Sequence, residues 1–307
     1  MTLDRQPQQG IKIAVAAAFI SGFAIFVNGL AVLRFDDATV YTTAKNLIAG
    51  AVLVIALITT LVVSPDPRSA QALRSAWPTL AVIALLGGAV PFVLFFEGLA
   101  RATSTNAAFI HKTLVVWVAL GATFILRERI TAVHVAAIGL LLGGHLMLSG
   151  GFGGSAFGRA ELLVLGATLC WASEVLIVKR LMVTVPYQVA AVSRMVGGSA
   201  ILVGWLAIKG DLGGLGGFAP SQWAWLVFTG TTLAAFVGTW YAALSMAPAL
   251  DVTAVLVPGA VLTGLMNAGF RGIPLTVDSY GYVLIVVGGM VVAASALQQP
   301  ARRRVST

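Results

Sequence analysis

Ten apolar runs, each close to the length that crosses a bilayer, constrain this chain more than any other feature of its sequence. A transmembrane helix needs about 20 predominantly apolar residues. The first run could be a signal peptide, but it is too long for one and leads straight into a multi-span chain, so we interpret it as a helix. The sequence predicts an all-α integral membrane protein with ten transmembrane helices. The runs are residues 11–33, 39–63, 76–98, 103–125, 131–149, 159–181, 187–208, 221–246, 250–270 and 276–297.

The composition excludes a soluble protein. Of the residues, 59% are hydrophobic and 10% are charged, whereas about a quarter of a soluble domain is charged. The 34 glycines fit close helix packing in a membrane. The net charge of +8 does not indicate nucleic-acid binding, because the basic residues lie mostly at the ends of the runs, where they act as topology signals.

The distribution of Lys and Arg predicts the orientation. With the N-terminus in the cytoplasm, eleven of these residues fall in internal segments and five in external ones. The other three, Lys45, Lys112 and Arg194, lie inside runs. Because basic loops stay on the cytoplasmic side, we expect both termini there. The predicted location is the bacterial cytoplasmic (inner) membrane, with a multi-pass chain embedded in the lipid bilayer as a monomer or weak dimer.

An internal repeat divides the chain into two halves. Residues 99–147 match 244–292 without a gap, and the second runs of the two halves align so that Lys45 pairs with Arg194. We expect halves at 1–150 and 151–307, packed as one membrane domain. Each half has five runs, an odd number, so the second must insert upside down relative to the first. Inverted repeats are typical of secondary transporters, whose substrate site lies near the midplane between the repeats.

The junction between the fourth and fifth runs carries a short motif. Its sequence RERIT (127–131) resembles a Gly-Glu-x-x-Thr signature, with Arg127 in place of Gly. The second half has GIPLT (272–276), which keeps the Thr but has Ile273 in place of Glu.

With the five-plus-five layout, the paired basic residues and the short loops, the chain resembles the EamA-like branch of the drug/metabolite transporter (DMT) superfamily. Amino-acid exporters of the aromatic and neutral type (YddG-type) share this length and layout. The resemblance implies alternating access, and it favours export over import.

Two polar residues interrupt the apolar stretch AAFIHKTLVVW (107–117). Lys112 lies about nine residues into its run, so about 14 Å of helix separates its ammonium from either membrane surface. The repeat mates of His111 and Lys112 are Leu256 and Val257, both apolar. The fold therefore does not require the charge, and a functional role is indicated.

The two residues are assigned alternative roles. Lys112 either faces a cavity and binds the carboxylate of a substrate, or forms a buried ion pair with Glu97 or Glu174. His111 either couples transport to protons, since imidazole titrates near neutral pH, or is a neutral, hydrogen-bonded side chain.

Other intramembrane residues complete the candidate site. Glu174 could bind a proton, a substrate amine or Lys112, because a carboxylate at this depth needs a partner or a purpose. Lys45 and Arg194 are repeat mates, which favours a shared structural or gating role. Deep aromatic residues either line the cavity or pack helices; they are Trp117, Trp171, Trp240 and Tyr241. Pro91 and Pro258 lie inside runs and are expected to kink or break them.

No cofactor, metal or catalytic site is predicted. The three histidines, at 111, 134 and 145, form no metal-spaced set with Cys or carboxylates, and no catalytic constellation is present. An enzyme is therefore disfavoured. Lys45, Lys112 and Arg194 also disfavour a cationic drug as ligand.

The preferred hypothesis is a secondary transporter of a small metabolite, such as an amino acid, with a coupled proton as a further ligand. The alternatives are an organic-anion or sugar-phosphate/nucleotide-sugar carrier, and a channel-like facilitator.

Overall fold

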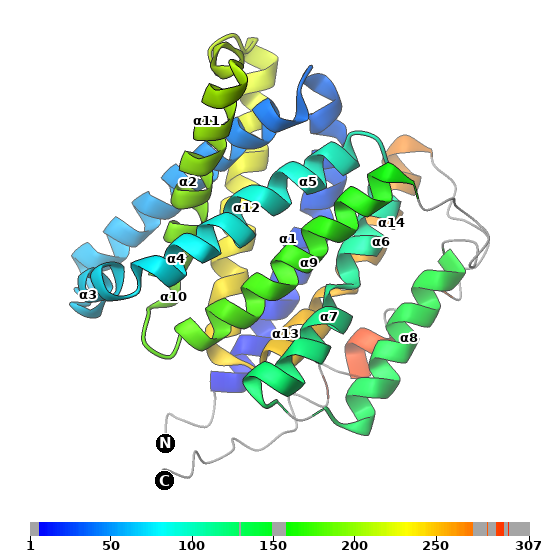
Figure 1. The fold of residues 1–307 in the computed structure, drawn as a ribbon. Coiled ribbons are helices and arrows are strands. Elements are labelled where there is room, and N and C mark those ends of the chain that lie inside the picture. The colour runs from blue at the N-terminus through cyan, green and yellow to red at the C-terminus, as the bar shows by residue number, and fades with distance from the viewer. Residues whose placement is uncertain are drawn as a thin grey trace.

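The computed structural model describes residues 6–128, 130–148, 158–272, 281, 287–291 and 294, which form a bundle of long helices (Figure 1). Among the described residues, eight helices are long and apolar enough to cross a membrane, which confirms eight of the predicted runs. They are Pro7–Arg34, Ala38–Val63, Trp77–Leu99, Asn106–Leu126, Arg159–Leu181, Tyr187–Lys209, Pro220–Met246 and Ala249–Arg271. The fifth run forms α8 (Ala132–Leu148), a shorter helix of 17 residues. Most of the predicted tenth run, 276–297, lies outside the described residues.

Several spans are divided into shorter helical pieces, often by π-helical segments. The first half contains α1 (Gln6–Ala31), η1 (Val32–Arg34), α2 (Ala38–Val63), α3 (Arg68–Ser75), α4 (Trp77–Ile83), η2 (Ala84–Ala89), α5 (Val90–Leu99), α6 (Ser104–Lys112), α7 (Leu114–Gly121), η3 (Ala122–Leu126) and α8. The second contains α9 (Arg159–Leu181), α10 (Tyr187–Val192), η4 (Ser193–Gly197), α11 (Gly198–Lys209), η5 (Leu212–Leu215), α12 (Pro220–Met246), α13 (Ala249–Leu256) and α14 (Gly259–Arg271). The segments η2, η3 and η4 are π-helical, a geometry that is frequent at functional sites.

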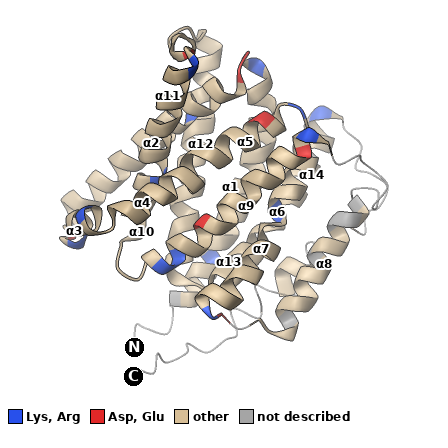
Figure 2. Ribbon diagram, in the orientation of Figure 1, with Lys and Arg blue, Asp and Glu red and all other residues tan. Residues whose placement is uncertain are grey.

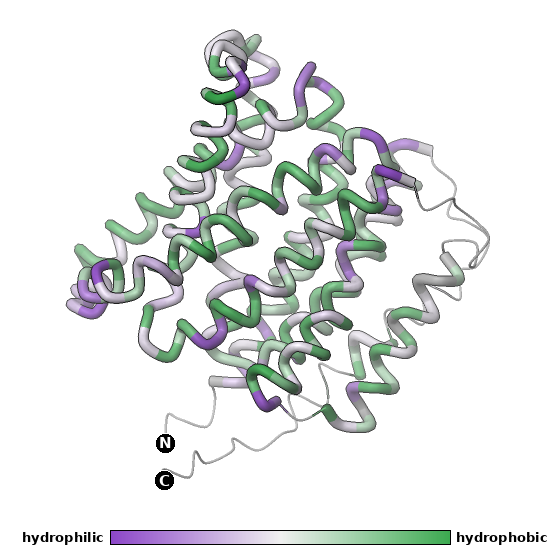
Figure 3. Tube along the Cα trace, viewed as in Figure 1, coloured by the Kyte–Doolittle hydropathy of each residue, from purple (hydrophilic) through white to green (hydrophobic). Residues whose placement is uncertain are grey.

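The outer surface suits a lipid environment. Apolar residues dominate the helices (Figure 3), while most charged residues lie toward helix ends (Figure 2). Large apolar side chains point outward, such as Phe124 at 82% exposure and Val62 at 77%. A soluble protein rarely exposes such contiguous apolar surface, so the structure supports the membrane assignment.

The two halves interleave rather than lie apart. Helix α1 of the first half packs along α12 of the second (Figure 1). Where α1 meets α14, a Cβ on Gly22 would lie 2.1 Å from the carbonyl oxygen of Gly259. Where η2 meets α11, a Cβ on Gly198 would lie 2.4 Å from the carbonyl carbon of Gly88. These helix crossings need glycine on both sides, and they place the interface between the halves in the centre of the bundle.

The motif junction of the first half has a backbone that favours glycine. Arg127 follows η3 with φ 56° and ψ 30°, in the left-handed region. Its repeat mate, Gly272, follows α14 with φ 62° and ψ 17°. The two junctions therefore share one helix-ending conformation, in which glycine carries no Cβ penalty. This explains physically why the resembling signature has Gly where this chain has Arg127.

Arg127→Gly should raise the free energy of unfolding by about 1 kcal/mol, because a left-handed conformation costs a residue with a Cβ roughly that much. Gly272→Ala should lower it by a similar amount. Thermal unfolding of the purified protein in detergent would measure both. The explanation is wrong if Arg127→Gly destabilises the protein and Gly272→Ala leaves it unchanged.

Candidate functional site

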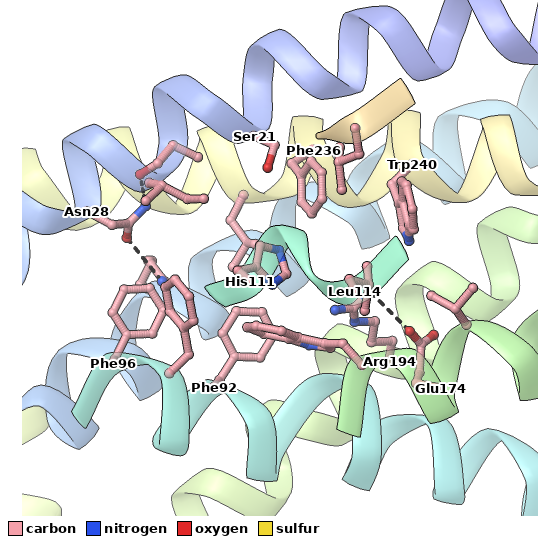
Figure 4. A pocket seen from close by; sticks show the side chains of 18 residues that line it. Ser21, Asn28, Phe92, Phe96, His111, Leu114, Glu174, Arg194, Phe236 and Trp240 are labelled. Carbon is pink, nitrogen blue, oxygen red and sulfur yellow. Dashed lines mark hydrogen bonds and ion pairs between the residues drawn. The ribbon is translucent and has the colours of Figure 1, made fainter. Parts of the chain in front are cut away.

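A cavity of about 80 Å³ lies where the two halves meet (Figure 4). Both halves contribute to its wall, which is largely aromatic and aliphatic. The aromatic lining residues are Phe92, Phe95, Phe96, Trp171, Phe236 and Trp240. The polar lining residues are Ser21, Asn28, Lys45, His111, Glu174 and Arg194. An apolar pocket with a few convergent polar groups is the usual form of a small-molecule site.

Several positions of the cavity lining occur in pairs, one in each half of the chain. Positions that the internal repeat pairs both face the cavity, but they carry different chemistry. The pairs are Lys45 with Arg194, Phe95 with Trp240 and His111 with Leu256. The cavity thus receives paired positions from both halves, and transporters built from repeats place their substrate site between the repeats.

The carbonyl oxygen of Gly87 organises one wall. Pro91, four residues later, has no N–H and cannot donate the usual helical hydrogen bond to it. Instead, Nε1 of Trp171 and Nε of Arg194 each donate to this oxygen at 3.0 Å. The kink predicted at Pro91 therefore coincides with the π-helical segment η2 and exposes a carbonyl that two side chains of the second half bind.

Arg194 is also paired with a buried carboxylate. Its Nη1 lies 3.7 Å from Oε2 of Glu174, and the two side chains are 4% and 1% exposed. The hydroxyl of Tyr241 donates a hydrogen bond to Oε1 of the same carboxylate. Tyr241 therefore lies behind Glu174 and holds it, rather than forming part of the cavity wall.

Lys45 has a different environment. Its Nζ donates to Oδ1 of Asn28 at 3.1 Å and lies 3.4 Å from the ring centroid of Phe96. The hydroxyl of Tyr41 donates to the same Asn28 oxygen at 2.6 Å. Within the described part of the chain, no carboxylate lies within ion-pair distance of Lys45. A buried ammonium held by an amide oxygen and an aromatic face retains the capacity to attract an anion.

His111 and Lys112 point in different directions, as adjacent helical residues do. The His111 ring lines the cavity, with its centroid 4.9 Å from Trp171 and 5.7 Å from Phe95. Lys112 is 2% exposed and lies outside the lining. Its Nζ donates to Oγ of Ser21 at 2.8 Å, and Ser21 itself lines the cavity.

The structure differs from several expectations for individual residues. Lys112 lies one layer behind the cavity wall. The alternative ion pairs are also not formed, since Glu97 pairs with Arg101 and Glu174 with Arg194. Trp117 is 36% exposed on the outer face and does not line the cavity.

Other expectations agree with the geometry. Trp171 and Trp240 line the cavity, which was one of the two alternatives for them. Lys45 and Arg194 also line it, and the structural or gating role predicted for them stays a prediction. Pro258 lies outside the lining, at the break between α13 and α14. The sequence reasoning missed the phenylalanines and Asn28. The repeat held a signal for Phe95, because its mate is Trp240.

Comparison with known proteins identifies the family. The sequence profile of the EamA-like transporter family matches residues 8–150 and again 158–295. The chain belongs to the EamA-like transporter family. It is therefore a multi-pass membrane transporter of small metabolites and not an enzyme. The double match agrees with the internal repeat, although it does not test the exact boundary between the halves.

A solved structure shows the same fold. A protein known from a crystal structure superposes on this EamA-like transporter with a TM-score of 0.70. The two are 20% identical, and the match covers 92% of this chain and 97% of the other. At this identity the likeness supports the architecture alone. No curated protein matches the chain.

The buried ion pair of Glu174 and Arg194 predicts how single and double substitutions change the free energy of unfolding. Glu174→Leu leaves the Arg194 guanidinium buried without its carboxylate, and this should lower the free energy of unfolding by about 3 kcal/mol. The double variant Glu174→Leu/Arg194→Met should recover most of that loss, because a neutral apolar pair can replace a buried ion pair. Unfolding in detergent would measure both.

The exposed pair of Glu97 and Arg101 provides the matched control. Its side chains are 25% and 56% exposed, so Glu97→Ala should cost less than about 1 kcal/mol. Equal losses in the single and double variants at 174 and 194 would show that Arg194 does not depend on Glu174.

Proposed function

We propose that this EamA-like transporter carries a zwitterionic metabolite, an amino acid with an apolar or aromatic side chain, by alternating access. The observation that carries the proposal is Lys45, an ammonium without a carboxylate partner among the described residues, in a cavity that also holds the carboxylate of Glu174. In Figure 4, Asn28 and Phe96, the neighbours of Lys45, lie at one end of the lining, and Glu174 lies at the other. A zwitterion presents the complementary charges.

Each group then has a defined role. Lys45 binds the substrate carboxylate, in place of Lys112, which lies outside the lining and donates a hydrogen bond to Ser21. Glu174 meets the substrate amine, and the aromatic wall contacts the side chain. A coupled proton would bind at Glu174 or His111, which are the titratable side chains of the lining other than Lys45 and Arg194.

The small size of the cavity supports a transport mechanism in which the two halves move apart. A volume of about 80 Å³ is well below the 300–1,000 Å³ that is usual for a small-molecule site. The described conformation is therefore too contracted for an aromatic amino acid, and the halves must separate for the substrate to enter. We further propose export from the cytoplasm across the inner membrane, with both termini inside.

A second candidate is a carrier of organic anions, favoured by two cations, Lys45 and Arg194, in one cavity. For an anion, Glu174 stays paired with Arg194 alone and Lys45 is the cation available to the ligand, whereas a zwitterion requires its amine to share Glu174 with Arg194. This pattern fits a monocarboxylate better than a sugar phosphate or nucleotide sugar, whose multiple charges would require several unpaired cations.

Counterflow in proteoliposomes tests the proposal. Vesicles preloaded with unlabelled phenylalanine should accelerate the uptake of labelled phenylalanine. Phenethylamine, which lacks the carboxylate, and 3-phenylpropionate, which lacks the amine, should each compete poorly. Competition by 3-phenylpropionate alone would favour the organic-anion carrier. Transport without acceleration would favour a channel-like facilitator.

Lys45→Met should reduce this counterflow about tenfold or more, because a charge-assisted hydrogen bond to the carboxylate contributes roughly 1.5–3 kcal/mol. Lys209→Met is the matched control, since Lys209 ends α11 beside Trp205, far along the chain from the lining residues. Unchanged counterflow in folded Lys45→Met protein would refute the assigned role.

A further inference from the structure

The N-terminus of α13 is capped by the other half of the protein. Its own N-cap residue is Pro248, which has no side-chain acceptor. The first-turn N–H groups of Ala249 and Leu250 instead donate to the two carboxylate oxygens of Glu128, at 2.9 and 3.1 Å. Glu128 belongs to the motif junction that follows η3 in the first half. A carboxylate at a helix N-terminus is favourable because it binds free N–H groups and the positive end of the helix dipole.

A second contact joins α13 to the start of α8, which directly follows the motif junction. The main-chain N–H of Thr131 donates to Nδ1 of His134 at 3.1 Å, which leaves the ring proton on Nε2. Nε2 lies 2.8 Å from Oδ1 of Asp251, in the first turn of α13. The side chains of His134 and Asp251 are 6% and 4% exposed. The junction and the first turn of α8 therefore bind α13 through an acidic cap and a buried His–Asp pair.

Among the described residues, the equivalent helix at the opposite end of the bundle is capped by its own N-cap residue. The repeat mate of Pro248 is Thr103, whose hydroxyl accepts from the N–H of Asn106 at 3.2 Å and so caps its own helix, α6. The repeat mate of Glu128 is Ile273, which has no side-chain acceptor. The symmetry of the two halves would permit equivalent closures at both ends, but the sequence provides the acidic cap at one end.

Contacts between the halves at that opposite end, within the described residues, include neutral hydrogen bonds. Nδ2 of Asn267 donates to Oγ of Ser104 at 2.9 Å, and Nε2 of Gln222 donates to the carbonyl of Arg34 at 2.9 Å. Hydrogen bonds to an ionised group are about twice as strong as neutral ones. Among the described contacts, Glu128 therefore supplies a charge-assisted cap at one end, whereas these two hydrogen bonds at the other end are neutral.

The break at Pro258 lets α13 move separately from α14. Pro258 has no N–H to donate to Ala254, and the helix restarts at Gly259. The N–H of Val257 donates instead to Ala254 at 3.2 Å, in a tighter turn. A short segment with a break at one end and a removable cap at the other is suited to swing as a unit.

We propose that Glu128, Thr131, His134 and Asp251 form a latch that closes the cytoplasmic entrance, so that the substrate-free transporter rests with this end shut. The inference rests on the proposed alternating access and on the predicted orientation. Opening the cytoplasmic side separates the motif junction from α13 and breaks the latch. Opening the other side leaves it intact.

Thiol accessibility tests the latch without any need for transport. The background is Cys170→Ala, which removes the single native cysteine. The reporter is Ala24→Cys on the cavity wall. A membrane-impermeant maleimide is added to inside-out or right-side-out vesicles, and the labelling rate is measured. The parent should label more slowly from the cytoplasmic side than from the external side.

Glu128→Gln removes the charge and one of the two acceptors while keeping the shape. It should speed cytoplasmic labelling about tenfold, the ratio expected for loss of a charged cap. Adding His134→Leu should increase the rate further. Glu161→Gln is the matched control, because Glu161 caps its own helix by accepting from the N–H of Gly158 at 3.1 Å. That change should leave the rate as in the parent.

Two results would overturn the latch. One is faster labelling of the parent from the cytoplasmic side, a comparison that needs no Glu128 variant to fold. The other is an unchanged cytoplasmic rate in folded Glu128→Gln protein. If labelling follows the latch pattern but phenylalanine counterflow is absent, the proposed substrate is wrong and the latch stands.

Discussion

The carbonyl oxygen of Gly87 is the point on which the interior of this protein depends. In a membrane, a main-chain group that loses its helical partner must find another inside the protein. Pro91 removes that partner, and the second half replaces it with Trp171 and Arg194. Arg194 in turn fixes Glu174. One proline thus orders a chain of contacts across the interface of the halves, and the cavity forms beside it.

Lysine, arginine and glutamate side chains buried around the cavity differ in how completely their charges are compensated. Arg194 has a carboxylate and a carbonyl, and Glu174 has a guanidinium and a phenol hydroxyl. Lys112 has the Ser21 hydroxyl, one layer behind the wall. Lys45 faces the cavity with an amide oxygen and an aromatic ring. Because a buried charge is costly without an opposite charge, Lys45 gains most from an anionic ligand.

Much of the architecture was predictable because apolar runs and a repeat are properties of the sequence itself. The repeat paired Lys45 with Arg194, which both line the cavity although the pairing favoured a structural or gating role, and Pro91 marked the distortion of its helix. The predictions that were wrong concern the direction in which a side chain points from its helix. About 100° of helix rotation separates His111, in the wall, from Lys112, behind it, and Trp117 faces outward. The sequence places Glu128 in a motif, but its partners, Ala249 and Leu250, follow only from how the halves pack.

The repeat-related lining has a consequence for the kind of molecule that the cavity can select. Two identical five-helix units would present every group twice and would therefore select a ligand with two equivalent ends. Joined in one chain, the halves have diverged at paired positions, such as Phe95 with Trp240 and His111 with Leu256. Fusion thus allows a nearly symmetric scaffold to recognise a head and a tail, and to hold its cargo in a single orientation.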